Sequence, residues 1–548
     1  MRGALLVLVA ACTEHVQLAS DDIPGLVALE ISPGEQRIAF DRVNPAAQHV
    51  AFAATGRFAD GHLEDVTERV HWAGSTPYPG RFDTAGDYTA TGEAVGHVGI
   101  AATSGEIRGD AALTIAMTAT VIDDVFGLPA DPAVFDGANE SIDPTRVPVV
   151  RYPATETRFP QELRPILFQH AFGTRNDTVR LRFSSEVLDL SVITASDRWS
   201  NDSIWTLIAG SHPASTVTLI VDGADSTMRG TFYSSSPVTL SFSAGPIVDA
   251  IYFFSSDSGV ARGGASIGSA VSIVDVSSDP HLAVSRNGRV MALEEGDKLS
   301  TFDLSSLERL LAPRENMGFA TVSPDGSRVL VADRGSLTLR DAISGEAIGP
   351  VLDLGGARKG THPDWSPDGR YIALAVSDMI DNVDAKHASI ARLPVEGDGF
   401  GPLEVLVTST GDIDNNFGPR WGANHELAYV HATSGAKDAK NAELRVIADA
   451  TIAPSAISPI RLPLASLVDV DVGMPSWTTG SDGASWLAFT STRPYGVLRP
   501  MQGTSQVWVA AIDLTRPDPS FAAFWLSGQS ITASSNGPVW APLPIEQR

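Results

Sequence analysis

Short apolar runs alternate with polar turns in the second half of the chain, most clearly in residues 362–376. The turn sequence there is Ser366-Pro367-Asp368-Gly369. Proline presets φ for the second position of a type I turn, aspartate suits the third, and glycine takes the left-handed position that follows. The apolar, partly β-branched run 371–375 is typical of a strand buried on both faces. The pattern predicts a hairpin that needs neighbours to cover its faces.

Related copies of this unit recur along the second half of the chain. Residues 323–332 are a clean copy, 285–292 a degenerate one, and 421–429 and 477–489 are looser. A last fragment, 536–542, restarts the pattern. The same number of residues separates Trp365 from Trp421 and Trp421 from Trp477. This regular spacing predicts a repeat architecture.

The strings SPDGRYIALA and SPDGSRVLVA resemble the PD40, or TolB-type, β-propeller repeat, a relative of WD40. The similarity covers roughly residue 267 to the end, and segments 491–496 and 506–513 resemble the last blades of envelope-associated TolB-like proteins. Residues 263–548 are therefore expected to form a propeller. Six restarts predict six blades, the last completed by a strand at about 270–276, which removes free sheet edges.

The first half of the chain is also predicted to form β-structure. Residues 25–116 alternate short strands, such as 29–31, with glycine-rich turns, and segments 59–72 and 88–102 resemble a bacterial Ig-like domain of the second group (Big_2). The resemblance implies a sandwich with Trp72 between its sheets. Residues 117–148, rich in Pro, Asp and Gly, are predicted to be a linker.

Residues 149–262 contain four candidate strands, at 180–183, 205–209, 217–221 and 251–254. Read as strands, they resemble an Ig-like or fibronectin III-like β-sandwich. The predicted fold class is thus all-β, with two N-terminal sandwiches and a C-terminal propeller. A chain of 548 residues is too long for one ordinary core, which agrees with several domains.

The charge balance limits the classes of partner that the protein is expected to bind. Lys and Arg number 39 against 65 Asp and Glu, a formal net charge of −26. This argues against nucleic-acid binding and against a basic membrane-binding patch. It is compatible with plain solubility, with cation binding or with a basic partner.

The single cysteine, Cys12, follows Met1-Arg2, an apolar run from Ala4 to Ala11, and small residues at positions 10 and 11. The run is far too short to span a bilayer. Residues 1–12 resemble a bacterial lipoprotein signal, which implies export and a lipid anchor at Cys12, with 13–24 as a tether. Thr13 in place of aspartate favours the outer membrane of a Gram-negative cell. The segment is short for such a signal, and the alternative is an uncleaved N-terminus with an incidental cysteine.

The search for catalytic and metal sites is mostly negative. Gly264-Ala265-Ser266-Ile267-Gly268 fits a nucleophile-elbow pattern, but its flanks do not read as strand and helix. The histidines form no H-E-x-x-H, and one cysteine allows no Cys/His zinc cluster. We predict no catalytic residue, no metal and no cofactor.

Calcium remains an alternative. Asp412, Asp414 and Asn416 alternate as at the start of a calcium loop, but Phe417 replaces the glycine and Ala423 the closing glutamate of an EF-hand. Asp412 and Asp414 would be the ligands of a site of another kind.

Segments that lead into the innermost strands of the blades are predicted to surround one mouth of the propeller channel. The candidate ligand contacts are the polar residues of these segments: His362, Asp364, Asp412, Asp414, Asn415, Asn416, Asp471 and Asn536. The structural alternative is that Asp and Asn there serve turns and strand ends.

Two functions are compatible with these features. The favoured one is a non-enzymatic, lipid-anchored envelope protein, in which Ig-like modules form a stalk and the propeller binds an unidentified envelope or surface protein. Membrane contact would be through the lipidated N-terminus only, without nucleic acid. The alternative is a propeller-channel enzyme or glycan-binding protein that uses carboxylates at the channel mouth.

Overall fold

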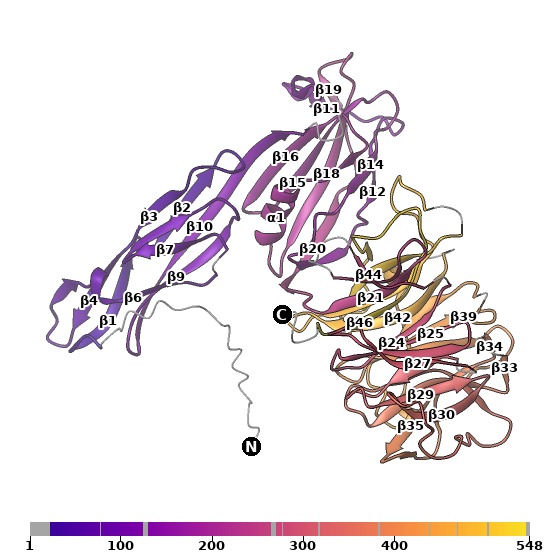
Figure 1. Cartoon of the computed structure of the whole chain (residues 1–548). Coiled ribbons are helices and arrows are strands. Elements are labelled where there is room, and N and C mark those ends of the chain that lie inside the picture. The colour runs from indigo at the N-terminus through magenta and orange to yellow at the C-terminus, as the bar shows by residue number, and fades with distance from the viewer. Residues whose placement is uncertain are drawn as a thin grey trace. The chain divides into compact units, whose positions relative to one another are not determined.

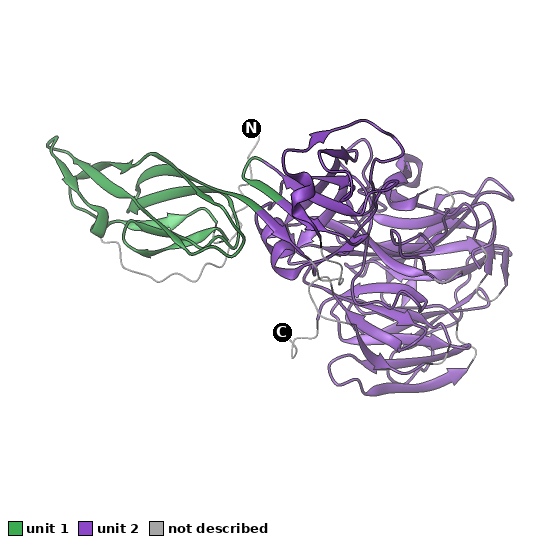
Figure 2. Cartoon of the chain, turned by 90° about the horizontal axis from the view of Figure 1, so that it is seen from above, with its two compact units in different colours: residues 1–119, 186–190 green, residues 120–185, 191–548 purple. Residues whose placement is uncertain are grey.

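The computed structural model describes residues 22–76, 78–123, 130–264, 270–276, 278–315, 318–381, 384–437, 439–467, 470–500 and 503–543. The predicted signal with Cys12, most of the tether and Ser266 lie outside these residues. The chain divides into two compact units, residues 1–119 with 186–190 and residues 120–185 with 191–548 (Figure 2). Strands dominate both units, which confirms the all-β prediction. No helix in the described part of the chain is long and apolar enough to cross a membrane.

The first unit is built from short strands in three hydrogen-bonded groups. They are β1 (Leu26–Ser32), β4 (Ala53–Phe58) and β5 (Leu63–Asp65); β2 (Glu35–Phe40), β10 (Ile107–Ile122), β9 (Gly96–Ser104) and β6 (His71–Gly74); and β3 (Gln48–Ala51), β8 (Asp87–Ala90) and β7 (Gly80–Thr84). Trp72 on β6 is buried against Phe82 of β7, with ring centroids 5.4 Å apart. It is a core residue between two of these groups, as predicted, while membership of the bacterial Ig-like group stays a prediction.

The second unit begins with a module of two sheets and one helix (Figure 1). The larger sheet contains β11 (Asn139–Glu140), β13 (Thr157–Gln161), β15 (Thr178–Ser184), β16 (Leu188–Thr194), β18 (Thr216–Ala224), β19 (Thr231–Ser234) and β20 (Val238–Pro246). The smaller contains β12 (Val149–Tyr152), β14 (Phe168–Ala171) and β17 (Arg198–Trp199). The predicted strands at 180–183 and 217–221 are confirmed as parts of β15 and β18.

The run 205–209 was predicted to be a strand, and this was wrong. It belongs to α1 (Asp202–Gly210), whose first turn is capped by the side chain of Asn201 accepting from the Ile204 N–H. The buried residues Ile204, Trp205, Leu207 and Ile208 have the helical spacing of one face. The asparagine cap and this spacing together outweigh the β-propensity of the aromatic and branched residues.

The described residues of the predicted linker at 117–148 include the end of β10, the short helix η2 (Pro132–Phe135) and the strand β11. In this segment η2 buries Val134 and Phe135 in a cluster with Ile193 and Ala224. Pro132 occupies the first turn of η2, where its missing N–H costs nothing. Proline and aspartate here mark a short helix start instead of an open tether.

Six sheets form the propeller, one per blade. Blade one has β24 (His281–Val284), β25 (Val290–Glu295), β26 (Lys298–Asp303) and β27 (Arg309–Glu315), and blade two β28 (Ala320–Val322), β29 (Arg328–Asp333) and β30 (Ser336–Asp341). Blade three has β31 (Lys359–Trp365), β32 (Tyr371–Ser377), β35 (Ser389–Glu396), β36 (Gly399–Phe400) and β37 (Glu404–Val407), with a hairpin of β33 (Met379–Asp381) and β34 (Asp384–Lys386). Blade four has β38 (Asn415–Trp421), β39 (Leu427–Ala432), β40 (Glu443–Ile447) and β41 (Ile460–Arg461), with η3 (Pro454–Ala456) and α2 (Pro463–Ser466) near its outer edge. Blade five has β42 (Val472–Thr479), β43 (Ser485–Ser491), β44 (Gln506–Ile512) and β45 (Phe524–Trp525).

Blade six joins the two ends of the propeller, because β46 (Ser535–Ala541) pairs with β21 (Ala250–Ser255), followed by β22 (Gly259–Gly263) and β23 (Val271–Val274). The innermost strands contact one another in order, and β46 contacts β24, so the ring is closed. The predicted strand at 270–276 does complete the blade of the last fragment: it is β23, the outermost strand, and β21 and β22 lie between it and β46. The run 251–254, assigned to the sandwich from the sequence, lies in β21, which is buried along its whole length as a strand between two neighbouring blades must be.

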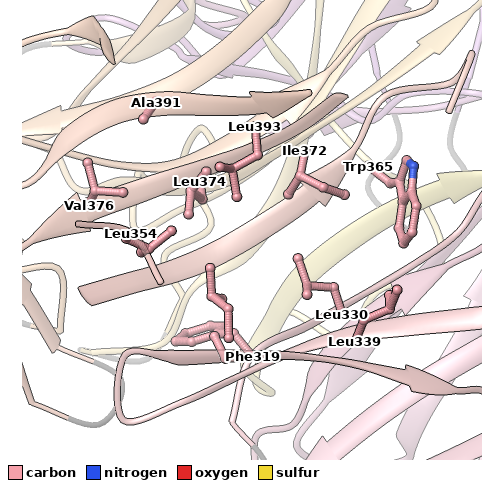
Figure 3. Packing of buried hydrophobic residues seen from close by; sticks show 12 residues of the cluster. Phe319, Leu330, Leu339, Leu354, Trp365, Ile372, Leu374, Val376, Ala391 and Leu393 are labelled. Carbon is pink, nitrogen blue, oxygen red and sulfur yellow. The ribbon is translucent and has the colours of Figure 1, made fainter. Parts of the chain in front are cut away.

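The predicted turns have the expected geometry in all three copies. The N–H groups of Gly369, Gly326 and Gly288 donate to the carbonyls of the serines three residues earlier, and the glycines have φ of +75°, +82° and +70°. Neighbouring blades pack through apolar side chains. In Figure 3, Phe319, Leu330 and Leu339 of blade two face Trp365, Ile372 and Leu374 of blade three. Each hairpin thus buries its faces against the next one, as the repeat predicts.

Candidate functional site in the propeller channel

Four innermost strands carry the same local motif: a residue with positive φ, then proline, a variable residue and tryptophan. The four copies are His362-Pro363-Asp364-Trp365, Gly418-Pro419-Arg420-Trp421, Met474-Pro475-Ser476-Trp477 and Gly537-Pro538-Val539-Trp540. The first residues have φ of +50°, +61°, +48° and +60°, and each strand shifts register with its neighbour there. Such bulges change the direction in which side chains point. They place the variable residues around the lower end of the channel, defined here as the end where the innermost strands finish.

Asp364 is the centre of a polar cluster at the lower end. Its carboxylate accepts the backbone N–H of Trp421 at 2.7 Å and a hydrogen bond from the Arg286 guanidinium at 3.0 Å. Arg420 lies farther away, with 3.9 Å between its Nη1 and a carboxylate oxygen. Burial lowers the pKa of Arg420, while the charge of Asp364 acts against that shift. One aspartate therefore holds two arginines in the channel.

Arg286 crosses the channel from blade one to the opposite side. Besides Asp364, its guanidinium donates to the carbonyls of Trp365 in blade three, at 3.1 Å, and Trp421 in blade four, at 3.3 Å. The cavity that remains at the lower end is about 20 Å³, the room of a single water molecule. This side chain closes the lower end of the channel.

The blades are also joined around the ring at this level. The backbone N–H of Trp365 donates to the hydroxyl of Thr321 at 3.1 Å. The backbone N–H of Trp540 donates to the hydroxyl of Ser476 at 2.9 Å. The Asp364 carboxylate likewise accepts the backbone N–H of Trp421. In each case a side-chain oxygen of one blade accepts the tryptophan N–H of another blade. The aspartate is therefore part of the connection between blades as well as a partner of Arg286.

Aromatic rings on or beside the innermost strands contact one another above this cluster. His281 contacts Phe319, Phe319 contacts His362, and His362 contacts Phe417, with centroid distances of 3.8, 4.1 and 5.9 Å. His362 is buried, and its Nδ1 has no hydrogen-bond partner in the described part of the chain. Burial lowers its pKa to about 3, and electrostatic interaction with His281 and Arg420 acts in the same direction. His362 is thus a neutral packing residue at physiological pH.

The predicted convergence of polar residues at one mouth is correct only in part. Asp364 was predicted to lie at the mouth where the innermost strands begin, and this was wrong. It is the second-last residue of β31 and lies at the lower end of the channel. His362, Asn415 and Asn416 lie near the upper end but are buried. Asp412, Asp414, Asp471 and Asn536 do lie at the upper mouth, where the innermost strands begin. Within this group, the carboxylates have separate partners.

Asp412 is 91% exposed and pairs with His387 at 3.0 Å. The Asp414 carboxylate accepts from the N–H and hydroxyl of Thr410 and from Asn416, and these hydrogen bonds lower its pKa against the opposing effect of desolvation. Asp471 is exposed, and Asn536 donates to Asp279 at 2.9 Å. No cluster of three or more His, Cys, Asp or Glu suited to a metal occurs among the residues described.

Asn415 connects blade four to the hairpin of blade three. Its side-chain oxygen accepts from the Ala388 N–H, and its amide donates to the carbonyls of Ala385 and Ser434, each at 2.9 Å. Asn415 is 1% exposed. An asparagine predicted to contact a ligand instead satisfies buried backbone groups.

Replacement of Asn415 with alanine should therefore destabilise the propeller. We expect a loss of about 2 to 3 kcal/mol in the free energy of unfolding, because buried backbone groups lose their partners. Asn424→Ala in the same blade, where the asparagine is exposed, should change it by less than about 0.5 kcal/mol. Urea unfolding of both variants measures the difference. Equal stabilities would show that Asn415 does not hold the hairpin.

Sequence reasoning missed Arg286, Arg420, Thr321 and Ser476. A signal for Arg286 was present, because it replaces the proline of the turn in the degenerate repeat 285–292, where clean copies have Pro324 and Pro367. The signal for Arg420 and Ser476 was the proline-x-tryptophan spacing repeated in four strands. A departure from the repeat thus marks Arg286, whereas the repeated spacing marks Arg420 and Ser476.

No protein-family model matches the chain. No curated protein matches it in sequence. Similar solved structures include a TolB-like protein from Agrobacterium tumefaciens (13% identity, 55% of this chain and 100% of that chain, TM-score 0.31). A quinoprotein alcohol dehydrogenase-like protein from Bacteroides thetaiotaomicron has 10% identity over 72% of this chain and 98% of its own, with TM-score 0.28. The propeller domain of the trilobed protease from Pyrococcus furiosus has 11% identity over 54% of this chain and 78% of its own, with TM-score 0.26.

Proposed function

We propose that this protein is a non-enzymatic, lipid-anchored protein of the bacterial cell envelope whose propeller binds another protein. The observation that supports the proposal most is the closed lower end of the channel: Arg286 crosses it, and Phe319 and His362 pack against each other above it. Carboxylate-dependent glycan chemistry requires a pair of facing carboxylates with a sugar between them. Asp364 is the one carboxylate among the described residues that line the lower cavity, and it is used by Arg286 and Trp421.

Binding by this propeller would then use its outer surface. Around the upper mouth, three large apolar side chains are exposed, and we call them the mouth surface: Met379, Ile413 and Leu467. Ile413 is 73% exposed and Met379 48%. They come from the hairpin of blade three and from the segments that begin blades four and five. Apolar side chains grouped on an exposed rim are typical of protein interaction sites.

The binding proposal is tested by capture from detergent-solubilised envelope with the intact chain, with and without a chelator. The double variant Met379→Asp and Ile413→Asp should lower recovery of a specific protein partner at least about tenfold. The matched control is Ile343→Asp, an exposed isoleucine that follows the end of β30 at the lower side of blade two. Recovery of glycan without protein, or chelator-sensitive binding lost in Asp412→Ala and Asp414→Ala, would contradict the proposal and favour the channel alternative.

The anchor is tested separately. Cys12→Ser should move the protein from the membrane fraction to the soluble fraction, because acyl chains would no longer attach. Unchanged membrane association in this variant would contradict a lipid anchor at Cys12, whatever the propeller binds.

A further inference from the structure

A larger cavity lies within the second unit, where the middle module meets blade five. Its volume is about 280 Å³. The module contributes the loop 163–167 between β13 and β14, and the propeller contributes Tyr495, Leu498, Trp525 and Ile531. We call this cavity the seam pocket. Binding sites for small molecules occur preferentially at such junctions between modules.

The walls of the seam pocket are held in place by the protein itself. The side-chain oxygen of Gln169 accepts the N–H groups of Val497 and Leu498 at 2.9 and 3.1 Å. The backbone N–H of Trp525 donates to the Tyr152 hydroxyl at 3.1 Å. These bonds join the module to blade five on two sides of the cavity, so the pocket does not depend on a ligand for its shape.

Gly496 shows how closely the two parts approach. Its φ is +63°, and a Cβ there would lie 2.5 Å from the Gln169 side-chain oxygen. Beside it, the Tyr495 and Trp525 rings stack with centroids 4.5 Å apart and planes inclined by 22°. The pocket therefore has one flat aromatic wall in a fixed position, next to the aliphatic side chains of Leu163, Ile166 and Leu498.

The charge at the seam pocket is opposite to that of the chain. Arg164 is the one charged residue among those that line it, and no described carboxylate does so. Arg164 is exposed and forms no hydrogen bond or ion pair with any other residue that the structure describes. In a chain of net charge −26, an arginine without a partner at the edge of an apolar cavity favours an anionic group from outside.

We propose that the seam pocket binds a small amphipathic carboxylate: a flat or compact apolar body in the cavity and a carboxylate directed at Arg164. A cavity of 150 Å³ holds a benzene ring, so this one accommodates about a dozen non-hydrogen atoms. The aromatic wall favours a planar body, which can pack against Trp525. This site is separate from the mouth surface and does not depend on the proposed function.

The test is a calorimetric titration of the full chain with 2-naphthoate, whose fused rings match this size, and with the neutral 2-naphthalenemethanol. We expect saturable 1:1 binding of 2-naphthoate with a Kd on the order of 0.1 to 1 mM, as is typical of ligands this small. The neutral compound should bind about fivefold more weakly, since it lacks the contact with an exposed arginine. Arg164→Gln should lower the affinity for 2-naphthoate to that of the neutral compound.

Arg499→Gln is the matched control, because Arg499 is also exposed but does not line the seam pocket. It should leave both affinities unchanged. Ile531→Trp, which places a large ring in the cavity, should abolish binding of both compounds. Absence of saturable binding to the unmodified chain up to about 5 mM would overturn the site. Equal affinity for the two compounds, or an Arg499→Gln effect as large as that of Arg164→Gln, would overturn the role of Arg164.

Discussion

Replacing Asp364 with alanine is expected to lower the free energy of unfolding of the propeller by about 3 kcal/mol, because two partly buried positive charges lose their partner. The Asp364 side chain is 13% exposed, and those of Arg286 and Arg420 are 28% and 21% exposed. The change also removes the acceptor of the Trp421 N–H and with it one connection between blades three and four. Unfolding in urea followed by tryptophan fluorescence measures the loss. The melting temperature should fall by about 5 °C or more.

Arg286→Ala should be less costly than Asp364→Ala. Asp364 then keeps the Trp421 N–H and Arg420, and no charge is left without a partner. The double variant should be more stable than the sum of the two single changes predicts, because both remove the same ion pair. Asp412→Ala is the control, since that aspartate is 91% exposed. An Asp364→Ala variant as stable as Asp412→Ala would show that the polar cluster does not hold the blades together.

Much of the fold could be predicted from the sequence because each repeat determines its own turn and strand through residues that are close together in the chain. The serine, proline and glycine of the turn fix backbone angles within four residues, and the apolar run after it admits one structure, a buried strand. Six restarts therefore gave six blades. The predicted strands failed where a local signal was ambiguous. Trp205 lies in a run of residues that favours a strand, but the Asn201 side chain caps the first turn and the run forms a helix.

Assignments that depend on distant partners could not be made in this way. The run at β21 is apolar in either a sandwich or a propeller, and only its pairing with β46, far along the chain, decides between them. The same holds for the channel. Asp364 and Arg286 are polar residues near turns, and nothing local indicates that one reaches the other across the ring. Asn415 begins β38, but its partners at Ala388 and Ala385 are backbone groups of another blade, which the sequence does not reveal.

The last prediction concerns pH and rests on His362. Its pKa in the folded protein is about 3, against the ordinary value of 6.5 that it has when unfolded. Between these values the unfolded chain binds a proton that the folded chain does not, so the contribution of His362 to stability is fully present above pH 6.5 and falls as the pH drops toward 3. From pH 7.5 to 5.0 the loss is about 2 kcal/mol from this residue alone.

Comparison with His362→Gln isolates the pH-dependent contribution of His362 to stability. Glutamine does not titrate, and any fixed cost of the substitution is the same at each pH. His362→Asn is the second variant, since asparagine tolerates the positive φ of +50° at this position. The stability difference between the unmodified chain and either variant should shift against the unmodified chain by about 2 kcal/mol when urea unfolding is repeated at pH 5.0. A difference that is the same at both pH values would mean that the folded protein protonates His362 as readily as the unfolded chain does. His362 and the rings that contact it would then be open to water, and the closed channel on which the proposed function rests would have to be abandoned.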